Sequence, residues 1–568
     1  MVKFPRRTVY LVLASILLLS LVVRYPLVEH ERHQTDSYFI HLLSQSIVDD
    51  GYAVWVFHPL SYFGYYPFSY PSGGPFLLAE VSSLTGMSVE LSILVTNCFF
   101  AALFCLAVFL LARQFISKPE LVLLATFFSV LAARFVDTSY WDASARAPLI
   151  VLMVLAIFAS MRVSWGNQKS MTGIAVVLGF GCFALHHMAV LLVVFGIGYM
   201  IAIFEVQYLI PRLRMRKRHI VVALNMVILV AVLAITYEIF DFAGQIGASP
   251  SDTSLFSIDP PWLSYYLNMG VSYTNQIGFV ILLAALSVPG ILIRARISVT
   301  NVFLLALIIS FVPLLWNSLY VSMVLAPFIA ILGALWVGRR MGNAKKRFST
   351  VVAVMIVMSV SVALPFWSSD HWNSQPYVSG DTVVVENQLF SDANYLRAVY
   401  QGVPGISNTN VESLHLAATS EVVFLGSGIY LTLSGDVKPE DVAQNVTLSN
   451  AKFPTNLYIW FEYTSEPKVD SYTLGFMMSG MSYLSPGTSF KDAVDYFRAH
   501  SKLLVIVDNK WPESSVSQYS VLPGALPVQL EQAGWKQVPY SSSQPTPIES
   551  YSIYSTEGIT VYALQIPL

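Results

Sequence analysis

Long apolar segments alternate with shorter polar loops from the N-terminus to about residue 365. The apolar segments cover residues 10–23, 91–111, 121–136, 148–161, 173–185, 189–208, 221–237, 277–293, 302–316, 321–337 and 351–365. The longest reach the ~20 residues that a helix needs to cross a hydrocarbon core of about 30 Å, and the others are shorter apolar cores of such helices. The pattern predicts a polytopic α-helical membrane protein with about eleven transmembrane helices.

Two places in this pattern need an additional decision. The basic start and the run 10–23 also fit a signal peptide, but no small-residue cleavage site follows, so we expect a retained first helix. A single helix over 171–208 would be about 57 Å long, almost twice the thickness of the core. We therefore expect two helices there, with His186 and His187 at the turn between them.

One polar stretch, residues 34–74, interrupts the apolar segments early in the chain. Its apolar residues between 38 and 48 recur at helical spacing, which predicts an amphipathic helix at the membrane surface. A run rich in Tyr, Phe, Pro and Gly follows and predicts a non-helical loop near the interface. Such a loop suits an amphiphilic substrate, and Tyr65 and Tyr70 are its candidate groove residues.

Composition supports the class of membrane proteins, and the positions of the cysteines exclude two kinds of site. The chain of 568 residues is 55% hydrophobic and only 12% charged, which is typical of a membrane protein. Its cysteines, Cys98, Cys105 and Cys182, fall inside apolar segments, so neither a disulfide framework nor a zinc-binding spacing is present.

Lys and Arg gather in alternate loops, which predicts a cytoplasmic N-terminus and an exterior C-terminus in the cell membrane. The basic run 212–218 fits a topology anchor better than a nucleic-acid site, so no nucleic-acid partner is expected.

The composition becomes soluble after about Trp367. Strand-like runs such as EVVFLG, KLLVIVD and ITVYALQI alternate there with helical patterns. We expect a transmembrane domain over residues 1–366 and an exterior α/β domain over 367–568.

The outer loops hold the candidate chemistry. Asp137 and Asp142 lie between Arg134 and Arg146 in ARFVDTSYWDASARAP. These residues form either two ion pairs at helix ends, or carboxylates that act as base and bind a divalent cation beside an arginine that binds phosphate.

Two further outer segments leave two interpretations open. His186 and His187 either contact the phosphate as well or cap the helix turn. Glu238, in the long loop after Tyr237, either lines an acceptor groove or packs on the exterior domain.

Three segments resemble a known family. TDSYFIHLLSQSIVDDGYAVW and SYFGYYPFSYPSGGPFLLA are similar to the first exterior loop of oligosaccharyltransferase catalytic subunits, and VDTSYWDASARAP is similar to the second acidic motif of that family. The topology resembles the glycosyltransferase C (GT-C) superfamily, whose members use polyprenyl-linked sugars as donors. The resemblance implies that Asp36, and Asp137 or Asp142, are the acidic residues that act as base or bind metal.

The exterior domain has no WWDYG segment, and the late outer loops have no clear SVSE-like motif. The sequence therefore predicts a membrane glycosyltransferase that moves a sugar from a polyprenyl phosphate or diphosphate to a protein, lipid or glycan acceptor at the exterior face. Mg²⁺ or Mn²⁺, bound by Asp36 and Asp142, is the expected cofactor. The alternatives are an oligosaccharyltransferase-like enzyme of protein N-glycosylation, and a transporter or exterior binding scaffold. Few ionisable residues lie within the spans, which disfavours a transporter.

Overall fold

The computed structural model describes most of the helical part of the chain and short stretches of the rest. The described residues are 5–26, 29–32, 37–51, 73–164, 168–209, 261–294, 299–311, 314, 318–342, 346–374, 387–400, 404–407, 416, 419–420, 423–425, 503–508, 536–537, 552–556 and 559–565.

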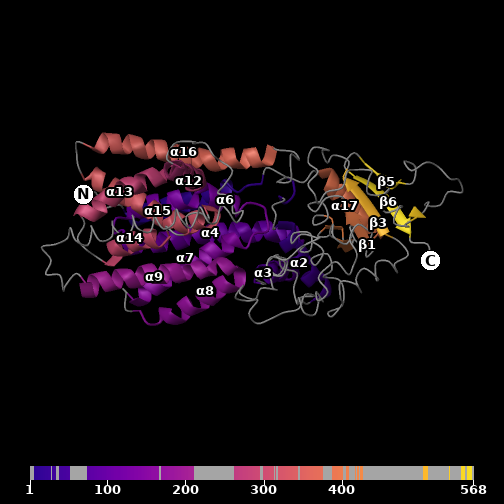
Figure 1. Cartoon of the computed structure of the whole chain (residues 1–568), viewed down its shortest axis with the longest axis horizontal. Coiled ribbons are helices and arrows are strands. Elements are labelled where there is room, and N and C mark those ends of the chain that lie inside the picture. The colour runs from indigo at the N-terminus through magenta and orange to yellow at the C-terminus, as the bar shows by residue number, and fades with distance from the viewer. Residues whose placement is uncertain are drawn as a thin grey trace.

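A bundle of long apolar helices forms the larger part of the molecule (Figure 1). Its members are α1 (Arg6–Val22), α4 (Val89–Phe115), α5 (Pro119–Val130), α7 (Arg146–Ser164), α8 (Met171–Leu185), α9 (Leu191–Ile203), α13 (Val280–Arg294), α14 (Val299–Phe311), α15 (Ser318–Met341) and α16 (Arg347–Ser374). They cover the expected spans with two exceptions. Residues 221–237 lie outside the described residues, and the expected span 121–136 is divided, because α5 ends at Val130 and a separate short helix, α6 (Ala133–Asp137), follows. Within the described residues, 5 helices are long and apolar enough to cross a membrane. The protein is a multi-pass membrane protein, and the count of eleven helices stays a prediction.

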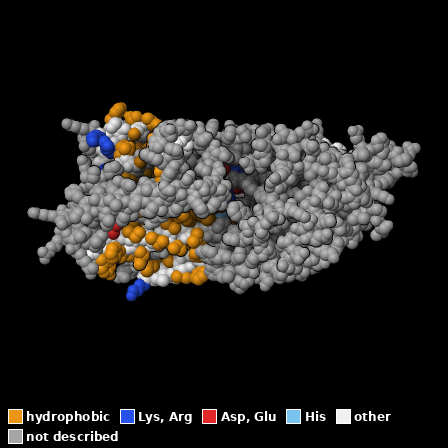
Figure 2. Space-filling model, viewed as in Figure 1, with side chains coloured by type: hydrophobic (Ala, Val, Ile, Leu, Met, Phe, Trp, Pro, Cys, Tyr) orange, Lys and Arg blue, Asp and Glu red, His pale blue; other side chains and the backbone are white. Residues whose placement is uncertain are grey.

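The packing of the bundle separates central from peripheral helices. Nearly all of the apolar part of α15 is buried, and α15 contacts α13, α5, α12 and α16. By contrast, α16 and α8 leave large apolar side chains exposed, among them Met355, Ile356 and Val177. In a bilayer, lipid chains would cover this surface, where hydrophobic side chains dominate (Figure 2).

The expected break near His186 is confirmed. Helix α8 ends at Leu185, and the 3₁₀-helix η2 (His187–Val190) leads directly into α9. After α9, a π-helical turn, η3 (Phe204–Leu209), extends the same span.

Shorter helices lie beside the bundle or at its ends. They are α2 (Ser37–Asp50), α3 (Gly73–Thr85), α6 (Ala133–Asp137), α12 (Pro261–Ile277) and α17 (Asn387–Tyr400). Helix α3 was not expected. It packs closely on α8, because a Cβ atom at Gly73 would lie 2.7 Å from the carbonyl oxygen of Ala184. Glycine is therefore needed at Gly73 for the two backbones to approach.

The expected helix at 38–48 is confirmed as α2, but its apolar residues are covered by protein on two sides. Tyr38 and Leu42 pack with the C-terminal domain, in one core with Phe390 of α17. Ile40 packs with Tyr140 and with residues of α3 and α4. Helix α2 thus connects the bundle with the C-terminal domain.

The C-terminal part contains a mixed sheet at the end of the bundle opposite the N-terminus (Figure 1). Its strands are β1 (Pro404–Ser407), β2 (Val423–Leu425), β3 (Leu503–Asp508), β4 (Lys536–Gln537), β5 (Ser552–Ser555) and β6 (Ile559–Gln565). The order is β2-β1-β3-β6-β4, and β5 pairs with β6. β1 is parallel to β2 and β3, whereas β3 and β6 are antiparallel with Val505 opposite Tyr562.

Alternate strand residues face α17, as expected for a half-buried sheet. Leu504 and Ile506 of β3 are buried with Leu396 of α17. The described strands and α17 therefore form the predicted α/β layer. The domain boundary at 366/367 stays a prediction, and α16 itself continues to Ser374.

Candidate active site

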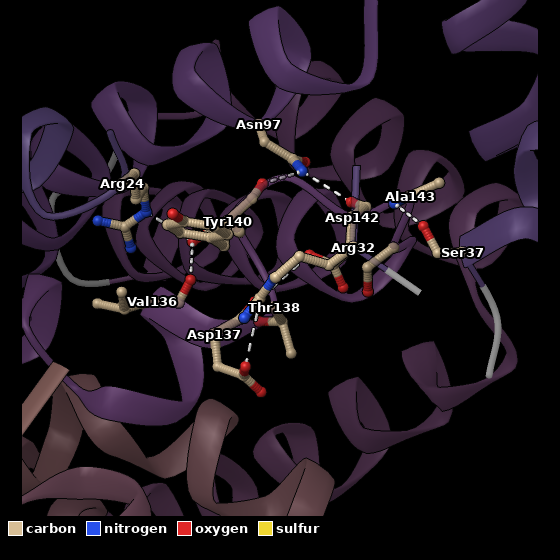
Figure 3. Close-up of polar contacts among 12 residues, drawn as sticks. Arg24, Arg32, Ser37, Asn97, Val136, Asp137, Thr138, Tyr140, Asp142 and Ala143 are labelled. Carbon is tan, nitrogen blue, oxygen red and sulfur yellow. Dashed lines mark hydrogen bonds and ion pairs between the residues drawn. The ribbon is translucent and has the colours of Figure 1, made fainter. Parts of the chain in front are cut away.

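The site is built on the acidic loop, residues 137–142, between α6 and α7 (Figure 3). Asn97 of α4 fixes its backbone, because its Nδ2 donates to the carbonyl oxygens of Tyr140 (2.6 Å) and Asp142 (2.8 Å). The backbone N–H of Ala143, directly after the loop, donates to Ser37 Oγ of α2 over 2.7 Å. The loop is thus hydrogen-bonded both to α4 of the bundle and to α2, the helix that packs against the C-terminal domain.

Arg32 attaches the segment that follows α1 to the same loop. Its backbone N–H donates to the carbonyl oxygen of Trp141 over 2.7 Å. Its Nη2 donates to the carbonyl oxygen of Asp137 (2.9 Å) and to Asp137 Oδ1 (3.4 Å). The guanidinium carbon lies 4.3 Å from the centroid of the Tyr140 ring, and the whole side chain is buried.

The two acidic residues of the loop have different surroundings. Asp137 Oδ2 accepts from Arg134 Nη1 over 2.7 Å, an ion pair between neighbours three residues apart on α6. The first of the two alternatives drawn from the sequence, an ion pair at a helix end, therefore describes Arg134 and Asp137.

Asp142 is 1% exposed, and within the described part of the chain neither carboxylate oxygen has a hydrogen-bond partner. Arg32 Nη2 lies 3.9 Å from Asp142 Oδ1, beyond hydrogen-bonding distance. Burial raises the pKa of Asp142 to about 7; Arg32 opposes this shift, and the charge of Asp137 adds to it. A buried carboxylate with such a pKa is a candidate base or metal ligand.

Arg146 and His186 both contact one aromatic ring, that of Tyr320 in α15. The Arg146 guanidinium carbon is 5.3 Å from the ring centroid, and the His186 ring centroid is 5.5 Å from it. His186 also caps η2, because its Nδ1 accepts from the backbone N–H of Met188 over 3.1 Å. The capping alternative therefore holds for His186, and this bond leaves the proton on Nε2.

A second group of charged residues lies beside the first, between α2, α4 and α17. His41 Nδ1 is 2.6 Å from Glu31 Oε1, and His30 Nδ1 is 3.0 Å from Glu90 Oε1. The His30 ring stacks on the Phe390 ring of α17 at 3.6 Å between centroids.

The Glu31–His41 pair is buried, and the two pKa values move in the same direction for different reasons. Burial raises the pKa of Glu31. Burial lowers the pKa of His41, but the Glu31 carboxylate outweighs it, so the pKa of His41 is raised overall.

Several predicted residues cannot be compared with this geometry. Asp36, Tyr65, Tyr70 and Glu238 lie outside the described residues. For His187 only the backbone is described, at the start of η2. Of the predicted site residues that are described, Arg134, Asp137, Asp142 and Arg146 lie close enough for their charges to interact.

Sequence reasoning missed Arg32, Glu31, Glu90, Asn97 and Tyr320. The signal for two of them was the run EHERH at 29–33, an unusual density of charge directly after an apolar span. Asn97 and Tyr320 lie within apolar segments and have no comparable signal.

The fold places the chain in a known structural class. No protein-family model matches the sequence, and no curated protein matches it. The fold is similar to that of an archaeal oligosaccharyltransferase, so the resemblance predicted from the sequence segments is confirmed at the level of fold.

The similar solved structures include the oligosaccharyltransferase of Archaeoglobus fulgidus. Its apo form is 12% identical with a TM-score of 0.52, over 74% of this chain and 64% of that one. Its complex with Zn and sulfate is 11% identical with a TM-score of 0.51, over 88% of this chain and 68% of that one. ArnT from Cupriavidus metallidurans in the apo state is 11% identical with a TM-score of 0.49, over 98% of this chain and 97% of that one. In the first comparison the chain thus spans 64% of the length of the archaeal enzyme.

Proposed function

We propose that this protein is a membrane glycosyltransferase that moves a sugar or glycan from a polyprenyl phosphate or diphosphate to an acceptor at the exterior face. The observation that carries the proposal is Asp142, a buried carboxylate without a hydrogen bond in the described structure, surrounded by arginines. It lies at the end of the bundle that faces the C-terminal domain.

The chemistry of transfer fits these groups. The acceptor needs a carboxylate to take its proton, and the departing phosphate needs positive charge. Asp142 would supply the first, with Asp36 or Asp137 as further candidates. Arg146 and Arg134 would supply the second, with His187. His186, which is neutral while its Nδ1 accepts from Met188, would instead contact the phosphate as a hydrogen-bond donor through Nε2. Tyr65, Tyr70 and Glu238 remain proposed residues of the acceptor groove.

A divalent cation, Mg²⁺ or Mn²⁺, is part of the proposal, with Asp142 as one ligand. Among the described residues, no three His, Cys, Asp or Glu side chains are grouped to hold a metal ion, so Asp142 would need a further ligand from elsewhere. Asp36 is our candidate, because the residue after it, Ser37, is hydrogen-bonded to the residue after Asp142. A bound cation would supply positive charge to the departing phosphate. That the similar archaeal enzyme was solved with Zn and sulfate supports this proposal.

The orientation of the chain is part of the proposal. Basic residues end several helices, among them Arg113 of α4, Arg162 of α7 and Arg339 of α15. The positive-inside rule places these ends in the cytoplasm. The C-terminal domain and the acidic loop would then face the exterior.

Donor turnover tests the proposed function. Purified protein is incubated with a panel of labelled polyprenyl-linked sugars, with and without Mg²⁺ or Mn²⁺, and release of the carrier is measured. Metal-stimulated release with at least one donor is the expected result. Binding of donors without turnover, with any acceptor class offered, would favour a scaffold or transporter.

Protein N-glycosylation is the second candidate, favoured by the fold of the archaeal oligosaccharyltransferase. A fluorescent peptide with an Asn-X-Thr sequon, added to the same assay, distinguishes the two. Glycan on the peptide supports N-glycosylation, whereas carrier release with lipid or glycan acceptors alone supports the broader proposal.

Metal binding should depend on pH because a metal ligand must be ionised. With a pKa of about 7, Asp142 is protonated below neutrality. The apparent affinity for Mn²⁺, measured by calorimetry, should therefore rise by about tenfold from pH 6 to pH 8. Asp142→Asn should remove the metal response, and an affinity independent of pH in the unmodified protein would argue against Asp142 as a ligand.

The substitution Arg146→Lys tests whether Arg146 binds phosphate through two hydrogen bonds or only provides a positive charge at the end of a helix. If Arg146 holds phosphate through two hydrogen bonds, Lys cannot reproduce the fork, and transfer should weaken by about tenfold or more. The matched control is Arg162→Lys, the same change at the other end of α7. Unchanged donor use by Arg146→Lys would leave Arg146 only a helix-end role.

A further inference from the structure

We propose that Arg32 is a positioning residue: it holds Asp137 in place and thereby leaves the buried carboxylate of Asp142 without a hydrogen bond, ready to accept a proton or a cation. The inference rests on the proposed function and identifies a residue that the sequence motifs did not include. It also assigns different roles to the two acidic residues of the loop.

Arg32 contacts the acidic loop at both ends. Its backbone binds the carbonyl oxygen of Trp141, next to Asp142, and its Nη2 binds the carbonyl and carboxylate oxygens of Asp137. The Tyr140 ring, between these two points, packs against the guanidinium and fixes its plane. The loop is therefore held around one buried side chain (Figure 3).

Arg32 interacts differently with the two carboxylates of the loop. Asp137 receives hydrogen bonds from Arg134 on Oδ2 and from Arg32 on Oδ1. Two such bonds to charged donors satisfy this carboxylate and hold its geometry. Asp142 Oδ1 is 3.9 Å from Arg32, near enough to be attracted and too far to be bound. A carboxylate that is attracted but not bound can accept a proton or a cation without first breaking a hydrogen bond.

Arg24 provides a matched control. It is also a fully buried arginine beneath the acidic loop, with Nε donating to Ser139 Oγ over 2.7 Å and Nη1 to Ser20. No contact joins it to either carboxylate in the described structure. A role that any buried arginine could fill would therefore be shared by Arg24, whereas of these two residues only Arg32 contacts Asp137 and could place it.

The test measures kcat, the KM for the donor and thermal unfolding in Arg32→Gln, Arg32→Lys and Arg24→Lys. We expect kcat to fall by about a hundredfold in Arg32→Gln, with the donor KM within about twofold, because a displaced catalytic group costs turnover rather than binding. Arg32→Lys keeps the charge without the fork, so we expect an intermediate kcat and a folded protein. Arg24→Lys should keep kcat within about threefold.

A double-mutant cycle of Arg32→Gln with Asp137→Asn completes the test. If Arg32 acts through Asp137, the effects on unfolding and on kcat should be strongly non-additive. Additive effects, a wild-type kcat in Arg32→Lys and Arg32→Gln, or a rise in KM alone would each overturn the proposal; the last would make Arg32 a phosphate contact. The unfolding cycle needs no turnover. Failure of the unmodified protein to use any donor would therefore count against the proposed function and not against the Arg32–Asp137 contact.

Discussion

Asp142→Asn should abolish transfer, lowering turnover by at least about a hundredfold while the protein stays folded. The amide has nearly the shape of the carboxylate, but it neither takes a proton nor supplies the negative charge that a metal ion needs. The carboxylate oxygens have no hydrogen-bond partner in the described structure, so the substitution breaks no hydrogen bond there. It also removes a charge that is costly to bury. We therefore expect a melting temperature equal to or above that of the unmodified protein.

The contrasting variant is Asp137→Asn. Asp137 is bound by Arg134 and Arg32, and loss of its charge leaves two buried guanidinium groups without their partner. Breaking a buried ion pair from one side costs on the order of 3 kcal/mol, so unfolding should occur at a clearly lower temperature. Carrier release and differential scanning fluorimetry on both variants give the comparison. A fully active Asp142→Asn protein would remove this residue from the site.

The helical part of the fold was predictable because the bilayer imposes a simple rule on sequence. A span must be apolar over a fixed length, and helices occupy the expected spans where the structure describes them, although the expected span 121–136 is divided between α5 and α6. The break at His186 followed from the same length rule. Strand-like runs predicted β3 and β6, where Leu504, Ile506, Ile559 and Val561 are buried. Helix α3 was missed because a Ser-Gly-Gly-Pro start is typical of a turn, although Pro75 in the first turn of a helix is tolerated.

The site was predictable only as far as neighbouring residues determine it. The Arg134–Asp137 ion pair follows from a spacing of three residues on a helix. The contact of Arg32 with Asp137 joins residues 105 positions apart, and no local pattern encodes it. From the sequence alone, Asp137 and Asp142 were both candidate catalytic residues. Their different surroundings follow from the position of Arg32, which is hydrogen-bonded to Asp137 and lies 3.9 Å from Asp142.

The position of Asp36, directly before α2, allows two roles, which the substitution Asp36→Asn distinguishes. A carboxylate at this place could cap the helix, and Asn accepts the same capping hydrogen bonds, so Asp36→Asn would then cost only about a few tenths of a kcal/mol and leave transfer intact. As a metal ligand or base, Asp36 must supply negative charge or take a proton, and the neutral amide does neither.

We expect the second outcome, a fall in turnover of at least about a hundredfold in Asp36→Asn with an unchanged melting temperature. The structural support is the hydrogen bond between Ser37 and Ala143, which ties the residues that follow Asp36 and Asp142 in the chain. Asp49→Asn is the matched control, because Asp49 is an exposed carboxylate in the last turn of the same helix, where it accepts from Gln45 Nε2 over 2.8 Å. That variant should keep full activity. If Asp36→Asn is folded and as active as Asp49→Asn in the donor assay, then Asp36 only caps α2, and Asp142 must obtain any metal partner from another part of the chain.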